Sequence, residues 1–465
     1  MNETWDVIVV GAGAAGLLAA ATAAERGLRT LLLEKNRRPG VKILMSGGTR
    51  CNLTQSTDKW GIVRAYRQQG NFLHSALAAL GPADLVKLVE DEGVPTKVEE
   101  TGKIFPVSNR ATDILEAFTK KLARSGAEMR LTTPVLGIER GEEGFVVKID
   151  PASAVRGPAS GVRQLPDGIE PAGEISPHRE AHASRSPDAA RPLVAAMQSA
   201  RPLVAAMQAR KVIVTVGGQS YPGSGTTGDG YAWAAALGHT IVPPRPALVP
   251  ITTEAAWVRA LSGITIPDVR LQLGHQDNPR KPLDERRGSL LFTHFGLSGP
   301  VVLDISGTLT AAAQPADLQL TCDFLPDVRP DQLDAQIRAA CSRDGKKQVV
   351  GLPLFALPRR LVEELVGLAG LPAEIKAAEL SKQNRAALVT ILKASPIAVN
   401  GTRGFAKAEV TAGGVRLQEI DSKTLESKLV PGLYFAGEVL DLDGPIGGYN
   451  FQAAFSTGYL AGLSV

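Results

Sequence analysis

The stretch DVIVVGAGAAGLLAAATAAERGLRTLLLE, residues 6–34, decides the fold of the domain that contains it. An apolar run at 6–10 is followed by three spaced glycines, an alanine-rich segment and a second apolar run. This order predicts a strand, a tight turn, a helix and another strand. Gly11 permits the turn, Gly13 lets backbone approach a pyrophosphate, and Gly16 lets the helix pack closely.

Glu34 ends this unit and lies 18 residues after Gly16. In dinucleotide-binding folds, a carboxylate roughly 20 residues beyond the glycines accepts hydrogen bonds from a ribose hydroxyl. The N-terminus of the predicted helix would present unpaired N–H groups to the phosphates. A glycine turn that served packing alone would leave Glu34 without a role. The stretch therefore predicts a dinucleotide site but does not decide between NAD and FAD.

Length and composition limit the classes of protein to consider. A chain of 465 residues suggests two or three domains, and 44% hydrophobic with 21% charged residues is typical of a soluble globular protein. No apolar run approaches the roughly 18 residues that span a bilayer, so we expect a cytoplasmic protein without a membrane partner. The net charge of +4 permits a nucleic-acid partner without requiring one.

Cysteine and histidine spacing predicts neither a disulfide framework nor a metal site. Cys51, Cys322 and Cys341 are far apart and lack CxxC spacing. His178 and His182 are four residues apart but lie in a proline-rich stretch, where we expect no metal site.

The first half of the chain contains one long irregular region. Residues 35–54 are too glycine-rich and polar for regular structure across their middle, whereas 72–93 and 111–126 have helical apolar spacing. Residues 130–149 alternate as strands with a turn at 141–144. Residues 151–210 contain eight prolines and a tandem copy of RPLVAAMQ, which predicts a disordered linker with room for a short helix over the duplication.

The second half alternates between strand-like and helical segments. Residues 211–218 read as a buried strand, and 229–237 as a helix. The sequence GSGTTG at 223–228 matches the glycine pattern, but it does not follow a strand directly, so we interpret it as a loop. Four short runs predict strands within 251–325: ITIPDVRLQL, GSLLFTHF, PVVLDISG and DLQLTCDF. Residues 330–395 read as helices.

The C-terminal stretch indicates which dinucleotide is bound. Residues 432–436 (GLYFA) read as a buried strand, followed by Gly437-Glu438, an acidic loop and a small-residue helix from about Phe451. Gly447-Gly448 would let backbone lie flush against a flat ring, and Asn450 is a candidate helix cap. The helix N-terminus would stabilise negative charge on a reduced flavin. Since a protein that binds only NAD has no need of this element, the pattern favours FAD.

Seven motifs are spread over nearly the whole chain apart from the linker. They are GAGAAG at 11–16, VKILMSGGTRCNLT at 41–54, GKIFPVS at 102–108, VTVGGQSYPGSGTTGDGYAWA at 214–234, LLFTHFGLSGPVVLDIS at 290–306, TAGGV at 411–415 and GLYFAGEVLDLDGPIGGYNFQAA at 432–454. Together they resemble the BaiN/RdsA (YhiN-like) family of bacterial NAD(P)/FAD-dependent oxidoreductases. Thr49 departs from the family pattern, which has a third glycine there, and Thr215-Val216 replace the usual Ala-Thr.

The resemblance implies an α/β fold class with a discontinuous, Rossmann-like FAD-binding domain. An inserted β-domain and a small helical domain would interrupt it, and the substrate pocket would lie where the inserted part meets the isoalloxazine. The expected bounds are 1–150, 211–245 and 400–465 for the FAD-binding domain, 151–210 for the linker, 246–326 for the β-domain and 327–399 for the helical domain.

The resemblance also suggests which residues contact FAD. The glycine unit would hold the ADP half, with backbone of Val135 at the adenine. Lys35 and Lys42 are candidates for the phosphates, with a solvated position as the alternative for each. The Arg50-Cys51 loop and residues 437–452 would hold the reactive half. The expected contacts are Gly11, Gly13, Ala15, Gly16, Glu34, Lys35, Lys42, Ser46, Gly47, Arg50, Cys51, Asn52, Val135, Gly217, Gly437, Glu438, Gly447, Gly448, Tyr449, Asn450 and Phe451.

The implied reaction consists of two hydride transfers. NADH or NADPH would reduce FAD, which would pass hydride to an electron-poor C=C bond, in an enone or in uridine of ribosomal RNA, while an acid protonates the neighbouring carbon. Cys51 is the first candidate acid, because Arg50 beside it would lower its pKa and Cys51→Ala would then slow substrate reduction. An inert buried cysteine is the alternative. His294 is the second candidate, with a hydrogen-bonded histidine of the β-domain as the alternative.

Two other functions stay open at this point. One is a flavin oxidase of a small amine, which would pass electrons to oxygen and release peroxide. The other is an RNA-binding or assembly protein that keeps FAD for structure, which NADH and NADPH would not bleach. The sequence does not distinguish NADH from NADPH, and it leaves the oligomeric state open.

Overall fold

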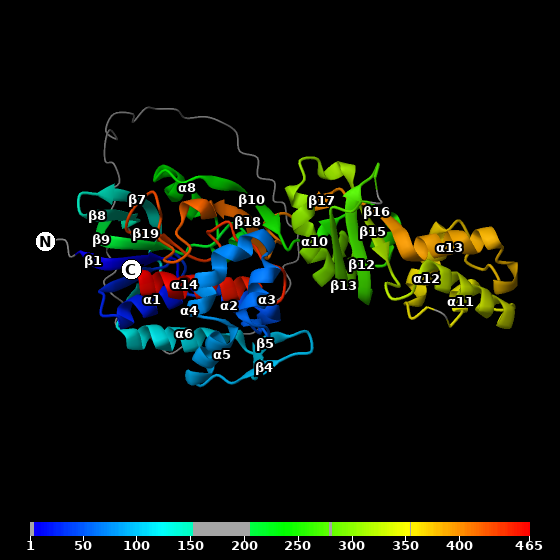
Figure 1. The fold of residues 1–465 in the computed structure, drawn as a ribbon, viewed down its shortest axis with the longest axis horizontal. Helices are drawn as coiled ribbons and strands as arrows, with labels where there is room; N and C mark the ends of the chain where they lie inside the picture. Colours follow the sequence, from blue (N-terminus) through cyan, green and yellow to red (C-terminus); the bar gives the residue numbers. More distant parts are fainter. Residues whose placement is uncertain (1–3, 152–204, 279–280, 354) are drawn as a thin grey trace, which may run out of the picture.

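The structure is a computed structural model that describes residues 4–151, 205–278, 281–353 and 355–465. Figure 1 shows three regions in a row along the longest axis. An α/β domain holds the first and last described elements, a region around a second β-sheet follows, and a group of helices lies at the far end. The α/β domain is therefore discontinuous in sequence.

A seven-stranded sheet forms the centre of the α/β domain, in the order β6-β2-β1-β9-β8-β7 with β19 paired to β9. The strands β6, β2, β1, β9 and β19 are parallel. Their carboxyl ends therefore meet at one edge, where a ligand cleft is expected. The bounds are β1 (Trp5–Val10), β2 (Thr30–Leu33), β6 (Glu128–Arg130), β7 (Val135–Gly141), β8 (Gly144–Ile149), β9 (Ala205–Val214) and β19 (Leu433–Phe435).

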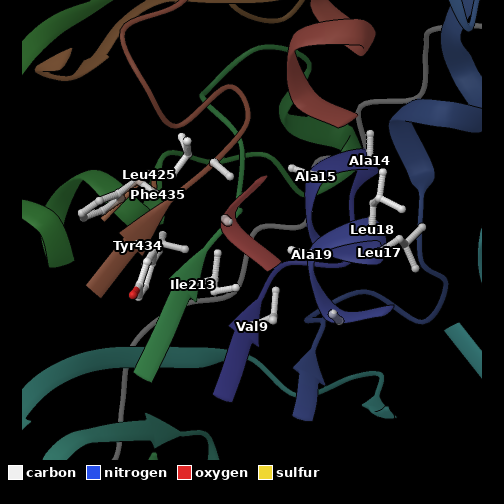
Figure 2. Close-up of a cluster of buried hydrophobic side chains, with 14 of the residues drawn as sticks. Val9, Ala14, Ala15, Leu17, Leu18, Ala19, Ile213, Leu425, Tyr434 and Phe435 are labelled. Carbon is white, nitrogen blue, oxygen red and sulfur yellow. The ribbon is translucent and has the colours of Figure 1, made fainter. Parts of the chain in front are cut away.

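Helices cover this sheet on both sides, with α1 and α14 on the side opposite α8 (Figure 1). Figure 2 shows α1 beside β1 and β9, with Val9 and Ile213 drawn from the strands. Helices α1 and α14 pack closely because Gly458 has no side chain: a Cβ there would lie 2.2 Å from the Ala15 carbonyl oxygen. The bounds are α1 (Ala14–Glu25), α6 (Ala111–Ser125), α8 (Asp229–Ala236) and α14 (Tyr449–Ser464).

Residues 41–106 add short helices and a three-stranded sheet, β3-β5-β4, to the same domain. The helices predicted within 72–93 and 111–126 are confirmed. The predicted irregular loop is partly wrong, because residues 41–45 are helical, whereas Ser46, Gly47, Gly48 and Thr49 have non-helical angles. The bounds are α2 (Val41–Thr49), β3 (Thr54–Gln55), α3 (Lys59–Ala65), η1 (Arg67–Leu73), α4 (His74–Ala79), α5 (Pro82–Asp91), β4 (Thr96–Val98) and β5 (Lys103–Pro106).

The stretch Arg67–Asp91 is long and apolar enough, by length and composition, to cross a membrane. It meets this condition on mean hydropathy and contains no uninterrupted apolar run of that length, since polar and charged residues such as His74, Asp84 and Lys87 interrupt it. In the structure the stretch is broken into three helices, because Leu80 is extended and Pro82 starts a new helix. Leu77 and Leu85 are buried in the core of the α/β domain. These helices are thus part of that core in the described fold.

The second sheet has the order β16-β15-β12-β13-β14-β11-β17. Three of the four predicted strands are confirmed as β12, β13 and β15, but the run PVVLDISG is a helix, α10. Pro300 suits the first turn of a helix, and Val301, Val302 and Ile305 are buried. The bounds are β11 (Ile251–Thr252), α9 (Ala256–Ala260), β12 (Thr265–His275), β13 (Asp284–Thr293), β14 (Gly296–Ser298), α10 (Pro300–Ala311) and β15 (Leu318–Asp323).

The helices predicted within 330–395 are confirmed, and they share one hydrophobic core with the second sheet. The sheet continues beyond residue 326, because β16 follows the last of these helices and β17 pairs with β11. The antiparallel pair of β10 and β18 connects back to the α/β domain. The bounds are α11 (Pro330–Arg343), α12 (Arg359–Leu368), α13 (Lys382–Ala394), β16 (Ser395–Ala398), β17 (Gly401–Thr402), β10 (Ile241–Ala247) and β18 (Val410–Val415).

Strand β9 begins at Ala205, inside the stretch predicted to be a disordered linker. Residues 205–209 pair in register with β8, and their side chains alternate in burial. The linker prediction and the helix over the duplication are therefore wrong for residues 205–210. Residues 152–204, with His178 and His182, lie outside the described residues.

Candidate functional site

A cleft of about 1260 Å³, counted out to its open mouth, lies at the carboxyl ends of β1, β9 and β19. Its lining includes the glycine turn, Thr133 beside Glu34, and Tyr66 beside Asn450; the part lined by Tyr66, Asn450 and Phe451 is called the Phe451 end. Twelve of the residues predicted to contact FAD line it: Gly11, Gly13, Ala15, Glu34, Lys35, Lys42, Val135, Gly217, Gly437, Glu438, Asn450 and Phe451.

The three glycines of the turn have different surroundings. Gly11 has φ +101°, and a Cβ there would lie 2.8 Å from the Thr215 carbonyl oxygen. A Cβ on Gly13 would meet nothing within 4 Å, so backbone is open to the cleft. A Cβ on Gly16 would lie 1.8 Å from the Gly11 carbonyl oxygen. The turn therefore packs directly against the first turn of α1 at Gly16, while Gly13 at the helix N-terminus stays open to the cleft. An exposed helix N-terminus is a suitable site for a pyrophosphate.

Glu34 is buried, and its carboxylate is hydrogen-bonded to the backbone of the glycine turn. One carboxylate oxygen accepts a hydrogen bond from the Ala12 N–H and the other from the Asn36 N–H, both at 2.8 Å. Burial raises the pKa of Glu34, while these two N–H groups oppose the rise. The carboxylate lies in the cleft lining, and its contact with a ribose stays a prediction.

Both candidate lysines are held by carboxylates in the cleft. The Lys35 ammonium lies 2.5 Å from Asp229, and that of Lys42 lies 2.7 Å from Glu438. Glu438 also accepts hydrogen bonds from the Ser220 hydroxyl at 2.7 Å and the Thr411 N–H at 2.9 Å. Both lysines are thus ion-paired while their side chains stay 31% and 28% exposed, and a contact with the phosphates stays a prediction.

The turn before α14 differs from the prediction. Gly448, not Asn450, is the N-cap, because the Asn450 amide accepts from the Gly444 N–H at 2.9 Å and donates to the Gly444 carbonyl at 3.0 Å. A Cβ on Gly448 would lie 2.6 Å from the Thr54 carbonyl oxygen, so this glycine allows close approach to β3. Gly447, Gly448 and Tyr449 do not line the cleft.

The loop expected to cross the flavin ring also lies outside the cleft lining. This holds for Ser46, Gly47, Arg50, Cys51 and Asn52, and Gly16 is likewise covered. Arg50 pairs with Glu99 at 2.6 Å, and its guanidinium lies 4.1 Å from the centre of the Phe105 ring. Thr49 has φ +67°, a backbone conformation that explains why glycine suits this position better.

Neither predicted acid is placed to donate a proton into the cleft. Cys51 is fully buried, and burial raises its pKa to about 12, so the expectation that Arg50 lowers this pKa is wrong. His294 is exposed at the turn between β13 and β14, where its ring meets the Phe295 ring edge-on at 5.0 Å. The geometry therefore favours the inert alternative for Cys51.

We expect Cys51→Ala to leave the rate of flavin reoxidation by substrate within about twofold of wild type, because the thiol has no access to the cleft. The change should cost about 1 kcal/mol of stability through a small cavity. Stopped-flow reoxidation and thermal denaturation measure the two effects, with Cys322→Ala, a buried thiol of the second sheet, as the control. A rate loss in Cys51→Ala that Cys322→Ala does not share would restore Cys51 as the acid.

Several polar residues at the Phe451 end were missed by the sequence analysis. Tyr66 and Glu409 line the cleft there, and Asp304 accepts a hydrogen bond from the Ile446 N–H at 2.8 Å. Burial raises the pKa of Tyr66, Glu409 and Asp304. The available signal was an acid inside an otherwise apolar segment: Asp304 in PVVLDISG, and Glu409 just before TAGGV.

Comparison with known proteins places the chain in a family. The profile of the HI0933-like protein Rossmann domain matches residues 5–159 and 194–464. The chain belongs to the HI0933-like family. It is 32% identical to the ribosomal RNA dihydrouridine synthase of Escherichia coli K12, over 98% of this chain and 97% of the relative. The synthase of the same name from Haemophilus influenzae is also 32% identical, over 100% and 99%.

A third relative of this chain is named for a different substrate, a bile acid. The 3-dehydro-bile acid delta(4,6)-reductase of Clostridium scindens is 28% identical over 98% of this chain and 97% of its own length. Together these findings confirm the predicted family, the α/β fold class with a discontinuous Rossmann domain, and the prediction of a flavin-dependent oxidoreductase. Within the described residues, no three His, Cys, Asp or Glu side chains are grouped to hold a metal ion.

Proposed function

We propose that this HI0933-like protein is a cytoplasmic reductase that takes hydride from NADH or NADPH through FAD and reduces an electron-poor C=C bond. Uridine in ribosomal RNA is the first candidate substrate. The observation that carries this proposal is the glycine-turn cleft in a chain related over its full length to two ribosomal RNA dihydrouridine synthases.

The cleft fits FAD in its chemistry. Gly13 and the first turn of α1 would take the phosphates, and Glu34 with backbone of Val135 would take the adenosine end. The Lys42–Glu438 pair and Phe451 are also part of the cleft lining. When bound there, FAD supplies the hydride chemistry, while these residues bind it, orient it and exclude water.

An enone of the steroid class is the second candidate substrate. It is supported by the relationship to the 3-dehydro-bile acid reductase of Clostridium scindens over 98% of the chain. An enone and uridine present the same reactive unit, a C=C bond conjugated to a carbonyl. The flavin chemistry is therefore compatible with either, and the substrate must be decided by experiment.

We expect NADH or NADPH to bleach the FAD-loaded protein without oxygen, and a ribosomal RNA transcript to restore the flavin absorbance. The test mixes the reduced protein anaerobically with the transcript, a steroid enone or buffer, and detects dihydrouridine by mass spectrometry. Transcript binding should weaken as salt is added, because phosphate contacts release counterions. Reoxidation by oxygen alone, with peroxide, would support the amine oxidase, and absence of bleaching would support a structural flavin.

A further inference from the structure

The far end of the cleft offers one acidic group that the hydrogen-bond network does not use. Tyr66, Glu409 and Glu438 are titratable side chains of the cleft lining, and Glu438 is already paired with Lys42 at 2.7 Å. The Tyr66 hydroxyl already donates to the Tyr449 carbonyl at 3.1 Å. The Glu409 carboxyl has no hydrogen-bond or ion-pair partner in the part of the chain that the structure describes.

The backbone of Glu409 is fixed although its carboxyl is not. Its N–H donates to the Leu248 carbonyl at 3.1 Å, and its carbonyl accepts from the Ser220 hydroxyl at 3.3 Å. The next residue, Val410, begins β18 and pairs with Ala247 of β10. Glu409 therefore lines the cleft from a backbone position that hydrogen bonds fix immediately before β18.

Charged groups from three other elements act on this carboxyl. Glu409 is exposed where the cleft is open, but the protein atoms crowded around its carboxyl raise its pKa by desolvation, and Asp304 on α10 raises it further. Lys103 on β5 and Lys42 on α2 act in the opposite direction. The net effect is a raised pKa, so the carboxyl keeps its proton to higher pH than a glutamate with the ordinary pKa.

We propose that Glu409 is the acid that protonates the substrate carbon, an inference that rests on the proposed C=C reduction. Hydride from the cofactor forms a C–H bond at one carbon, breaks the C=C π bond and leaves an electron pair conjugated with the carbonyl. The Glu409 O–H bond breaks as its proton forms the second C–H bond, and a carboxylate is left. Water at the open mouth of the cleft returns the proton. The substrate gains two electrons and two hydrogens, and the flavin is oxidised.

We expect Glu409→Gln to slow reoxidation of the reduced protein by a ribosomal RNA transcript or a steroid enone by roughly 10²–10⁴-fold, since general acids contribute about that much. Reoxidation by ferricyanide should stay within about twofold of wild type, because it needs no proton on carbon, and FAD affinity should be unchanged. The matched control is Glu374→Gln, an exposed glutamate in the far helical region. An equal loss with both oxidants, or no loss with either, would overturn the proposal.

The pH dependence gives a second test. The wild-type rate should fall as pH rises through the raised pKa of Glu409, and Glu409→Gln should lack this fall. Lys103→Gln should move the midpoint to higher pH, and Asp304→Asn to lower pH, since each removes one charge that acts on the carboxyl. Midpoints that do not move in these directions would contradict the assignment.

Infrared titration of the FAD-free protein provides a readout that does not depend on turnover. The raised pKa values of Glu34, Asp304 and Glu409 predict several protonated-carboxyl components in the wild-type spectrum, and Glu409→Gln should lose one of them while the others remain. A difference spectrum between wild type and Glu409→Gln that lacks a protonated-carboxyl component would overturn the assignment of the proton to Glu409. If neither transcript nor enone reoxidises the wild-type protein, the proposed function fails, while this titration still decides whether Glu409 holds the proton.

Discussion

Gly16→Ala should destabilise the α/β domain and abolish FAD binding, whereas Gly13→Ala should leave the fold intact and only weaken binding. A Cβ on Gly16 would lie 1.8 Å from the Gly11 carbonyl oxygen and 2.6 Å from the Thr215 hydroxyl oxygen. Neither neighbour can yield easily, because the Thr215 hydroxyl donates to that same carbonyl at 2.8 Å. Overpacking of this kind costs about 1–3 kcal/mol or more and would move the whole turn.

Gly13→Ala is the matched control because the same methyl group would enter open space in the cleft. Its effect should fall on the ligand alone, since the pyrophosphate must approach backbone there. Urea denaturation of the FAD-free proteins measures the free energy of unfolding, and flavin fluorescence titration measures affinity. Equal stability of the two variants would contradict the assigned packing role of Gly16, and unchanged affinity in Gly13→Ala would contradict the position assigned to the phosphates.

The sequence predicts the cofactor half of the cleft well because its signals are local. The glycine spacing, the two flanking strands and Glu34 all lie within 29 residues, and each is placed by its own backbone geometry. The far end of the cleft is different, since Lys103, Asp304 and Glu409 come from three distant segments. These three residues come close together only because the second sheet packs against the α/β domain. No local sequence pattern predicts that packing.

The wrong predictions have a common physical cause: tertiary packing overrides the structure that the local sequence pattern favours. The run PVVLDISG is apolar enough for a strand, but in the fold it is helix α10, whose Val301, Val302 and Ile305 pack into the core of the second sheet. Cys51 beside Arg50 looked activated in sequence, but Arg50 turns away to Glu99 and the thiol is buried. Asn450 has the chemistry of a cap, yet its amide fastens the loop at Gly444.

Asp284 is expected to hold the junction between the α/β domain and the second sheet. One carboxylate oxygen accepts from Arg67 of η1 at 3.2 Å and from the Glu285 N–H at 2.9 Å. The other accepts from Arg286 at 3.1 Å and from the Thr308 hydroxyl at 2.8 Å. The Asp284 side chain is 6% exposed, so these four donors surround a buried charge.

Asp284→Ala should therefore cost about 1–3 kcal/mol, the range for leaving buried hydrogen-bond donors without their acceptor. Four donors would lose the carboxylate, and one of them, Arg286, is only 28% exposed and already has a buried Nε without a partner in the described residues. Arg67→Gln is the matched control: its side chain is 58% exposed, so it should cost under about 1 kcal/mol. Urea denaturation followed by tryptophan fluorescence, which includes Trp257 of the second sheet, measures both. If Arg67→Gln lost as much unfolding free energy as Asp284→Ala, the stabilisation would come from the Arg67 contact between the domains and not from the other hydrogen bonds to the buried carboxylate.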